Sequence, residues 1–158
     1  MDSPPRIYDT KLGDANRMIR RSQDALYFTE ELIQKIAEKR PIKLWDCVNM
    51  FFPRETNRKQ FDCALVFLQA LEKNGSLQNT EVMTLYDSQN ERYTLTGHVV
   101  PKLRKFGVIE SNGRVCSKRY SYRFGKDFSQ LLRDLGLELF GYYARHYNDV
   151  KQLEGNSH

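Results

Sequence analysis

Residues 76–124 read SLQNTEVMTLYDSQNERYTLTGHVVPKLRKFGVIESNGRVCSKRYSYRF, and the predicted fold depends on this stretch. A short polar segment opens it, and a helix-like piece follows at 80–86. After a polar turn at 87–92, a second helical pattern runs through 94–106. The stretch therefore predicts two consecutive helices separated by a turn.

The end of the stretch changes from a helical to a strand-like pattern. The apolar segment 108–111 is followed by a polar loop at 112–118 and by the alternating segment 119–124. In that last segment aromatic residues occupy one side of a strand, while Arg119 and Arg123 occupy the other. We expect a two-stranded hairpin whose aromatic side packs on the core, because one face of a small antiparallel sheet is usually buried.

Positive charge is concentrated in the segment 92–126. The whole chain has a net charge of +5, whereas this segment has nine basic residues against one acid, Glu110, a net of +8 that leaves −3 for the remainder. Basic charge gathered on a helix and a hairpin favours a nucleic-acid-binding face over a solvated charge run. The nine residues are Arg92, Lys102, Arg104, Lys105, Arg114, Lys118, Arg119, Arg123 and Lys126.

A helical wheel divides the second helix, 94–106, into two sides. At about 100° per residue, Leu95, Val99 and Leu103 fall within one narrow apolar arc. Pro101 does not fit the interior of a regular helix, so we expect either a kink or a regular helix that starts near Val99 with Pro101 in its first turn. The opposite arc holds Thr94, Gly97, His98, Pro101, Arg104 and Lys105.

Residues 102–110, KLRKFGVIE, join a helix end of the form Lys-Leu-x-x-x-Gly to apolar residues and an acid. This pattern resembles the passage from recognition helix to wing in winged-helix transcription regulators, and the resemblance covers 61–124, less than half of the chain. It implies binding to double-stranded DNA, with the helix 94–106 in the major groove and the hairpin 108–124 as a basic wing.

Ten residues are assigned to DNA contact under this interpretation. Thr94, Gly97 and His98 are expected to face base edges, because they lie toward the start of the recognition helix. The basic residues are expected to bind phosphates. The full set is Arg92, Thr94, Gly97, His98, Arg104, Lys105, Arg114, Lys118, Arg119 and Arg123.

Helices are also expected before this stretch. Residues 29–39 and 42–52 have helical apolar patterns, the first with Thr29 as its N-cap. The helix 58–74 is the most apolar and is expected at the centre of the core. Residues 1–25 are polar and are expected to form a flexible or partly helical arm.

The segment 127–152 predicts one long helix at the end of the chain. Its apolar residues, from Phe128 to Val150, recur at steps of three, four and seven. A helix of this length is longer than one small domain needs, so we expect it to fold back along the N-terminal helices or to pair with a second copy. We favour a homodimer, because a two-fold protein matches paired half-sites on DNA.

The expected fold is mainly α with a small β-hairpin. A winged helix-turn-helix domain with an N-terminal helical extension occupies 26–126, and the helix 127–152 is a candidate dimerisation element. No run approaches the roughly 18 apolar residues of a membrane span. The N-terminus also lacks the apolar region of a signal peptide. We therefore expect an intracellular protein, cytoplasmic or nucleoid-associated, with no membrane partner.

The favoured function is that of a transcription regulator that binds double-stranded DNA. Two alternatives remain: a winged-helix module for protein assembly in a multi-subunit complex, and a plasmid or viral replication-initiation protein. The sequence has no nucleophile elbow, phosphate loop or metal motif, and its three cysteines form no CxxC pair. We therefore expect neither an enzyme nor a cofactor or metal site.

Overall fold

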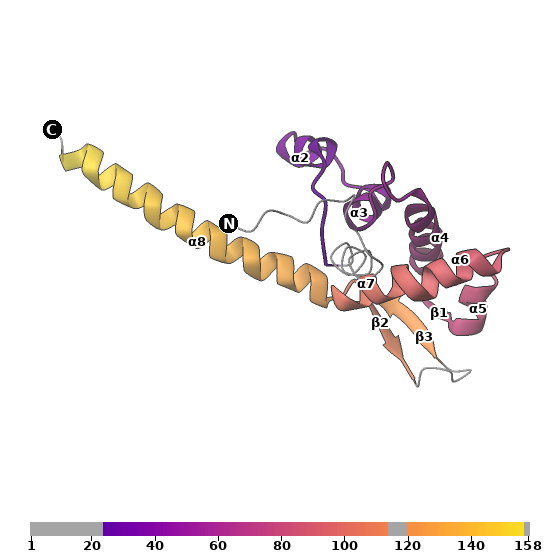
Figure 1. Ribbon diagram of the computed structural model, residues 1–158. Helices are drawn as coiled ribbons and strands as arrows, with labels where there is room; N and C mark the ends of the chain where they lie inside the picture. The colour runs from indigo at the N-terminus through magenta and orange to yellow at the C-terminus, as the bar shows by residue number, and fades with distance from the viewer. Residues whose placement is uncertain (1–23, 114–119, 157–158) are drawn as a thin grey trace, which may run out of the picture.

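The structure, a computed structural model, describes residues 24–113 and 120–156 (Figure 1). The chain is mainly helical, with a small three-stranded antiparallel sheet and a long C-terminal helix. The elements are α2 (Glu30–Ala37), α3 (Leu44–Phe51), α4 (Arg58–Asn74), β1 (Ser76–Gln78), α5 (Asn79–Met83), α6 (Gln89–Thr94), η2 (Leu95–Val99), α7 (Val100–Lys105), β2 (Ile109–Asn112), β3 (Ser121–Phe124) and α8 (Asp127–Asn156).

Helix α4 lies at the centre of the core, as its composition predicts. Phe61, Phe67 and Leu71 are each at most 1% exposed, and Gly75, with φ at 77°, ends the helix in the left-handed conformation that glycine adopts most easily. The Phe67 ring meets that of Tyr122 edge to face, with centroids 5.5 Å apart. One helix therefore packs against α3, against the helices that follow it, and against the sheet.

The sheet has the strand order β1-β3-β2, and both pairings are antiparallel. The predicted hairpin is present as β2 and β3. Its aromatic side packs on the core through the buried Tyr120 and Tyr122, whereas Phe124, the third aromatic residue of that side, is 41% exposed. Residues 76–78 were expected to be a short polar segment, with no strand assigned to them. They form the third strand, because Leu77 is buried opposite Tyr122 while its neighbours face solvent.

Two glycines join the base of the hairpin to α8. Gly107 has φ at 76°, and a Cβ there would lie 2.6 Å from the Asp127 Cβ. A Cβ on Gly125 would lie 2.7 Å from the carbonyl oxygen of Gly107. The chain can turn into and out of the hairpin here because neither residue has a side chain.

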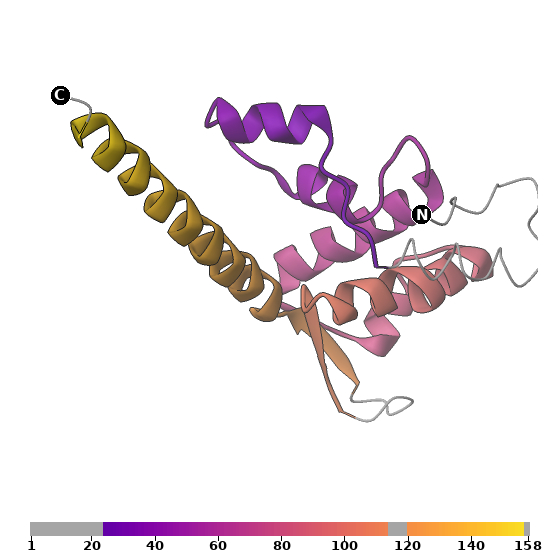
Figure 2. The same cartoon turned by 60° about the vertical axis from the view of Figure 1, so that its left-hand side comes forward.

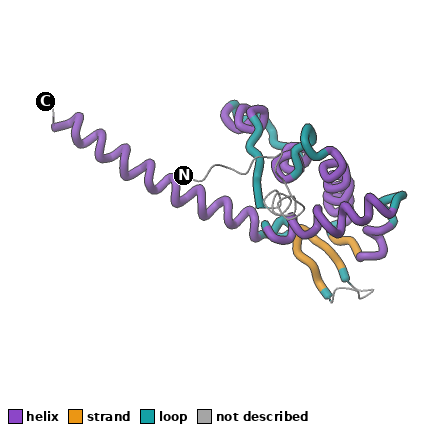
Figure 3. The backbone as a smooth tube through the Cα atoms, viewed as in Figure 1, coloured by secondary structure: helices purple, strands orange, loops and turns teal. Residues whose placement is uncertain are grey.

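The helix after the turn is continuous from α6 through η2 to α7 (Figure 3). It begins at Gln89, where the Ser88 hydroxyl accepts from the Glu91 amide at 3.2 Å, so the expected polar turn at 87–92 is wrong for its second half. The middle segment η2 is a π-helical turn, and α7 starts at Val100 with Pro101 in its first turn. This agrees with the second of the two arrangements expected for the proline: the wider turn before Pro101 accommodates a residue that lacks an amide donor.

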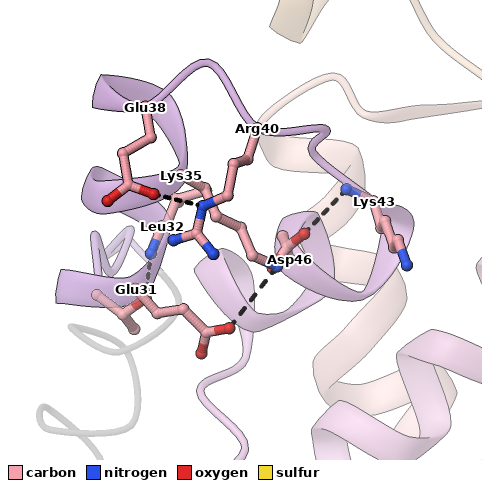
Figure 4. A network of polar contacts seen from close by, with 8 residues as sticks. Glu31, Leu32, Lys35, Glu38, Arg40, Lys43 and Asp46 are labelled. Carbon is pink, nitrogen blue, oxygen red and sulfur yellow. Dashed lines mark hydrogen bonds and ion pairs between the residues drawn. The ribbon is translucent and has the colours of Figure 1, made fainter.

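A partly buried ion pair holds α2 against α3 (Figure 4). The Lys35 ammonium donates to the Asp46 carboxylate at 2.8 Å, and the backbone amide of Lys43 donates to the other carboxylate oxygen at 2.9 Å. Burial alone would raise the pKa of Asp46, but these two hydrogen bonds outweigh it and hold the pKa below its ordinary value. Thr29 caps α2 by accepting from Leu32, as predicted.

Helix α8 leaves the rest of the chain as a straight rod (Figures 1 and 2). Its first turn is anchored by Phe128, whose ring packs edge to face on Phe51 and Phe106 with centroids 5.1 and 6.0 Å away. From Leu131 onward its large apolar side chains are exposed. Within the described residues α8 does not fold back along the N-terminal helices, so the first of its two expected arrangements is wrong. No helix of the described ranges combines the length and hydropathy of a membrane span.

Candidate nucleic-acid interface

The exposed side of the α6–α7 helix is set by the π-helical turn. Leu95, Val99 and Leu103 point into the core at steps of four and are fully buried. The opposite row, also at steps of four, consists of Tyr93, Gly97, Pro101 and Lys105, all exposed. A regular helix would let both rows drift around the axis, whereas one wider turn keeps them straight.

Thr94 and His98 are less exposed than their expected contact with base edges implies. Both are half-buried. Thr94 lines a hollow of about 730 Å³ together with Lys59 and Asp62 of α4, and its hydroxyl donates to the Asn90 carbonyl at 3.0 Å. His98 lines a second, smaller hollow beside Gln60 and Lys102. Of Thr94, Gly97 and His98, which were expected on one outer arc, only Gly97 lies in the exposed row.

Lys102 is inside the protein, although it was counted with the basic face. Its side chain is 3% exposed, and its ammonium donates to the Phe51 carbonyl at 2.5 Å. The same ammonium lies 5.3 and 5.2 Å from the ring centroids of Tyr27 and Phe52. Burial lowers the pKa of Lys102 to about 8, and the negative charge of Asp24 opposes that shift. This lysine ties α7 to the segment before α2 and to the end of α3.

Arg92 also has a structural role. It is half-buried, and its guanidinium donates to the carbonyl oxygens of Met83 at 3.2 Å and Tyr86 at 3.1 Å. These bonds brace the loop 84–88 between α5 and α6. A guanidinium held by two backbone carbonyls in this way has little freedom to reach a phosphate.

Arg104 links α7 to the hairpin. It is exposed, its guanidinium donates to the Tyr120 hydroxyl, and its central carbon lies 5.7 Å from the Tyr120 ring centroid. The sequence gives no signal for this role of Tyr120, because alternation predicts only that its ring is buried. The bond fixes the position of Arg104 relative to β3.

Two more of the assigned basic residues are exposed and form ion pairs. Lys105 pairs with Asp24, and both side chains are more than half exposed. Arg123 pairs with Glu110, its cross-strand neighbour, at similar exposure. Exposed pairs of this kind contribute little to stability, so a phosphate can compete for either cation. The assigned residues Arg114, Lys118 and Arg119 lie outside the described residues.

The 730 Å³ hollow between α4 and α6 has a polar rim and a hydrogen-bonded floor. The Tyr86 hydroxyl donates to the Cys63 carbonyl at 2.7 Å, and the Cys63 thiol donates to the Glu91 carbonyl at 3.6 Å. Burial raises the pKa of the Cys63 thiol to about 11, so the thiol is protonated near neutral pH. Within the described ranges no three His, Cys, Asp or Glu side chains are grouped as metal ligands would be. The hollow offers hydrogen-bonding surface without an activated nucleophile.

Comparison of the chain with protein-family models, with curated proteins and with solved structures found no match.

Proposed function

We propose that this chain binds double-stranded DNA as a transcription regulator, with the α6–α7 helix as the recognition helix and the β2–β3 hairpin as the wing. The observation that carries the proposal is the position of two cations at the end of α7. Arg104 and Lys105 are exposed there, and Tyr120 joins Arg104 to the start of β3. The end of the helix thus presents two basic side chains beside the hairpin, as groove and backbone contacts require.

The order and pairing of the elements support the same proposal. Helix α4, strand β1, the two helices after it and the hairpin β2–β3 follow one another as they do in winged helix-turn-helix proteins. The exposed row Tyr93, Gly97 and Pro101 would face the bases, since its inner counterpart is fully buried. Gly97 allows close approach, because a Cβ there would have no neighbour within 4 Å.

A homodimer through α8 is part of the proposal. The helix has 30 residues and is about 45 Å long. Beyond its first turn its apolar side chains are exposed, and a second copy would cover them. Two linked DNA-binding units would then contact two half-sites of one duplex.

A protein-assembly module is the second candidate function. Apolar side chains are exposed on α2 as well as on α8, with Ile33 and Ile36 each more than half exposed. Such faces are typical of protein–protein contacts. Assembly alone, however, gives no reason for the concentration of basic charge in 92–126.

The experiment that tests DNA binding compares two glycines. Gly97 lies in the exposed row of the recognition helix, Gly141 lies on α8, and a Cβ at either would have no neighbour within 4 Å. Gly97→Glu should weaken binding of the full chain to a labelled mixed-sequence duplex at least about tenfold, because it places an acid against the phosphates. Gly141→Glu adds the same charge elsewhere and should change affinity by less than about twofold. Equal losses in the two variants, or no duplex binding by the wild type, would refute the proposal.

A further inference from the structure

Five exposed apolar side chains of α8 form one stripe. Leu132, Leu135, Leu139, Tyr142 and Tyr143 are between 41% and 60% exposed. At 100° per residue they fall within an arc of about 100°, and further exposed apolar side chains, among them Leu137 and Phe140, lie outside that arc. An exposed stripe of this length is a contact surface, because leaving it in water forgoes the free energy of burying each side chain.

No contact among the described residues of a single copy requires a glycine at position 136. Glycine inside a helix costs about 1 kcal/mol relative to alanine. A Cβ at Gly136 would have no neighbour within 4 Å, so nothing in this chain requires a small residue at that position. Gly136 lies at the edge of the stripe, beside Tyr143, which is 59% exposed. In a pair of such helices, a glycine at the edge of the stripe would leave room for a bulky side chain of the second copy.

We propose that α8 pairs with the α8 of a second copy in the antiparallel direction, about a two-fold axis between Phe140 and Gly141. In that register Leu139 packs against the second copy's Tyr142, and Leu135 against the second copy's His146. The two-fold axis repeats both contacts. Gly136 then faces the second copy's Tyr143 across one flank of the stripe, a small residue against a large one.

Charge on the other flank favours the same direction. Glu138 and Arg145 lie on that flank, about 20° apart around the helix axis. In the antiparallel register each faces the other across the seam, which gives two opposite-charge pairs. In a parallel, in-register pair Glu138 would face Tyr143 instead, and the two copies of Asp149 would meet at the seam. The helix is therefore complementary to itself in one direction only.

This inference rests on the homodimer part of the proposed function and is independent of DNA binding. Its test measures mass without DNA, by light scattering and sedimentation of the full chain at micromolar concentrations. The wild type should be a dimer. Glu138→Arg and Arg145→Glu should each weaken the dimer about tenfold, because each turns two attractive pairs into repulsive ones. An equimolar mixture of the two variants should dimerise as the wild type does, since unlike charges then face each other.

The glycines provide a second readout with a matched control. Gly136→Leu should weaken the dimer, because its side chain would occupy the space of the second copy's Tyr143. Gly141→Leu, on the side of the same helix that faces away from the stripe, should leave the dimer intact. A monomeric wild type would overturn both the homodimer and its geometry. A wild-type dimer whose charge variants do not rescue each other would overturn the antiparallel register and leave the DNA-binding proposal untouched.

Discussion

Replacement of Lys102 by methionine tests whether the charge of this lysine is buried, through the pH dependence of the free energy of unfolding. The ammonium is held by the Phe51 carbonyl and two aromatic rings, and burial lowers its pKa from the ordinary 10.5 to about 8. Methionine has a similar length and fills the same space, but it does not titrate. The comparison therefore isolates the protonation of one group.

The magnitude follows from the two pKa values. Below pH 8 the lysine is charged in both the folded and the unfolded chain, and the whole cost of burying the charge is present. Between pH 8 and 10.5 the folded chain loses the proton while the unfolded chain keeps it, so the free energy of unfolding rises with pH. The pKa difference corresponds to an increase of about 3 kcal/mol across this window.

Urea unfolding at pH 7, 8, 9 and 10.5, followed by circular dichroism, measures this effect. The unfolding free energy of the wild type minus that of Lys102→Met should rise by about 3 kcal/mol between pH 8 and 10.5. Subtraction removes the contributions of every titratable group that the two proteins share. Lys73→Met, at an exposed lysine at the end of α4, is the control and should give no such rise. Identical pH profiles for wild type and Lys102→Met would refute the burial of this charge.

Two further predictions concern the hairpin. Gly107→Ala should lower the free energy of unfolding by more than about 2 kcal/mol, measured by thermal unfolding, because a positive φ is combined with a Cβ only 2.6 Å from the Asp127 Cβ. The control Gly75→Ala, with equally positive φ but open space, should cost about 1 kcal/mol. Equal losses would contradict the tight junction at Gly107. Glu110→Gln should raise the affinity for duplex DNA a few-fold at low salt, because it frees Arg123 from its ion pair. The control Glu72→Gln, on the exposed side of α4, should leave the affinity unchanged. An unchanged affinity for Glu110→Gln would show that Arg123 does not contact the DNA.

Most helices can be predicted from the sequence, because the spacing of their apolar residues shows which side of each helix is buried. The apolar pattern of 58–74 gives α4 with its observed bounds, and Thr29 correctly marks the start of α2. The third strand was missed because β1 has three residues, of which only Leu77 is buried, and so short an alternation carries no periodic signal.

The positions on the recognition helix were harder to predict, because they depend on the phase of the helix. A regular wheel assumes 3.6 residues per turn, and the π-helical turn at 95–99 rotates everything after it. His98, within that turn, lies beside Gln60 and Lys102, and Thr94, just before it, lies beside residues of α4. Pro101 was the available warning, since it excludes a regular helix at that point.

The number of basic residues in a sequence also overestimates the positive charge that is exposed on the protein surface. Arg92 and Lys102 carry two of the nine positive charges in 92–126, and both donate to backbone carbonyls inside the protein. A long basic side chain can bury its apolar stem and bond a carbonyl, which composition does not reveal. A buried basic residue of this kind can be recognised only when the structure shows which backbone carbonyl accepts its hydrogen bond.

The salt dependence of duplex binding tests the central claim most directly. Affinity of the full chain for one labelled duplex would be measured from 50 to 300 mM salt. With about five phosphate contacts per protomer from the helix and hairpin, log affinity should fall with log salt with a slope of about −4 to −5. An affinity that stays constant over this range would contradict the assignment of the α6–α7 helix and the β2–β3 hairpin to DNA.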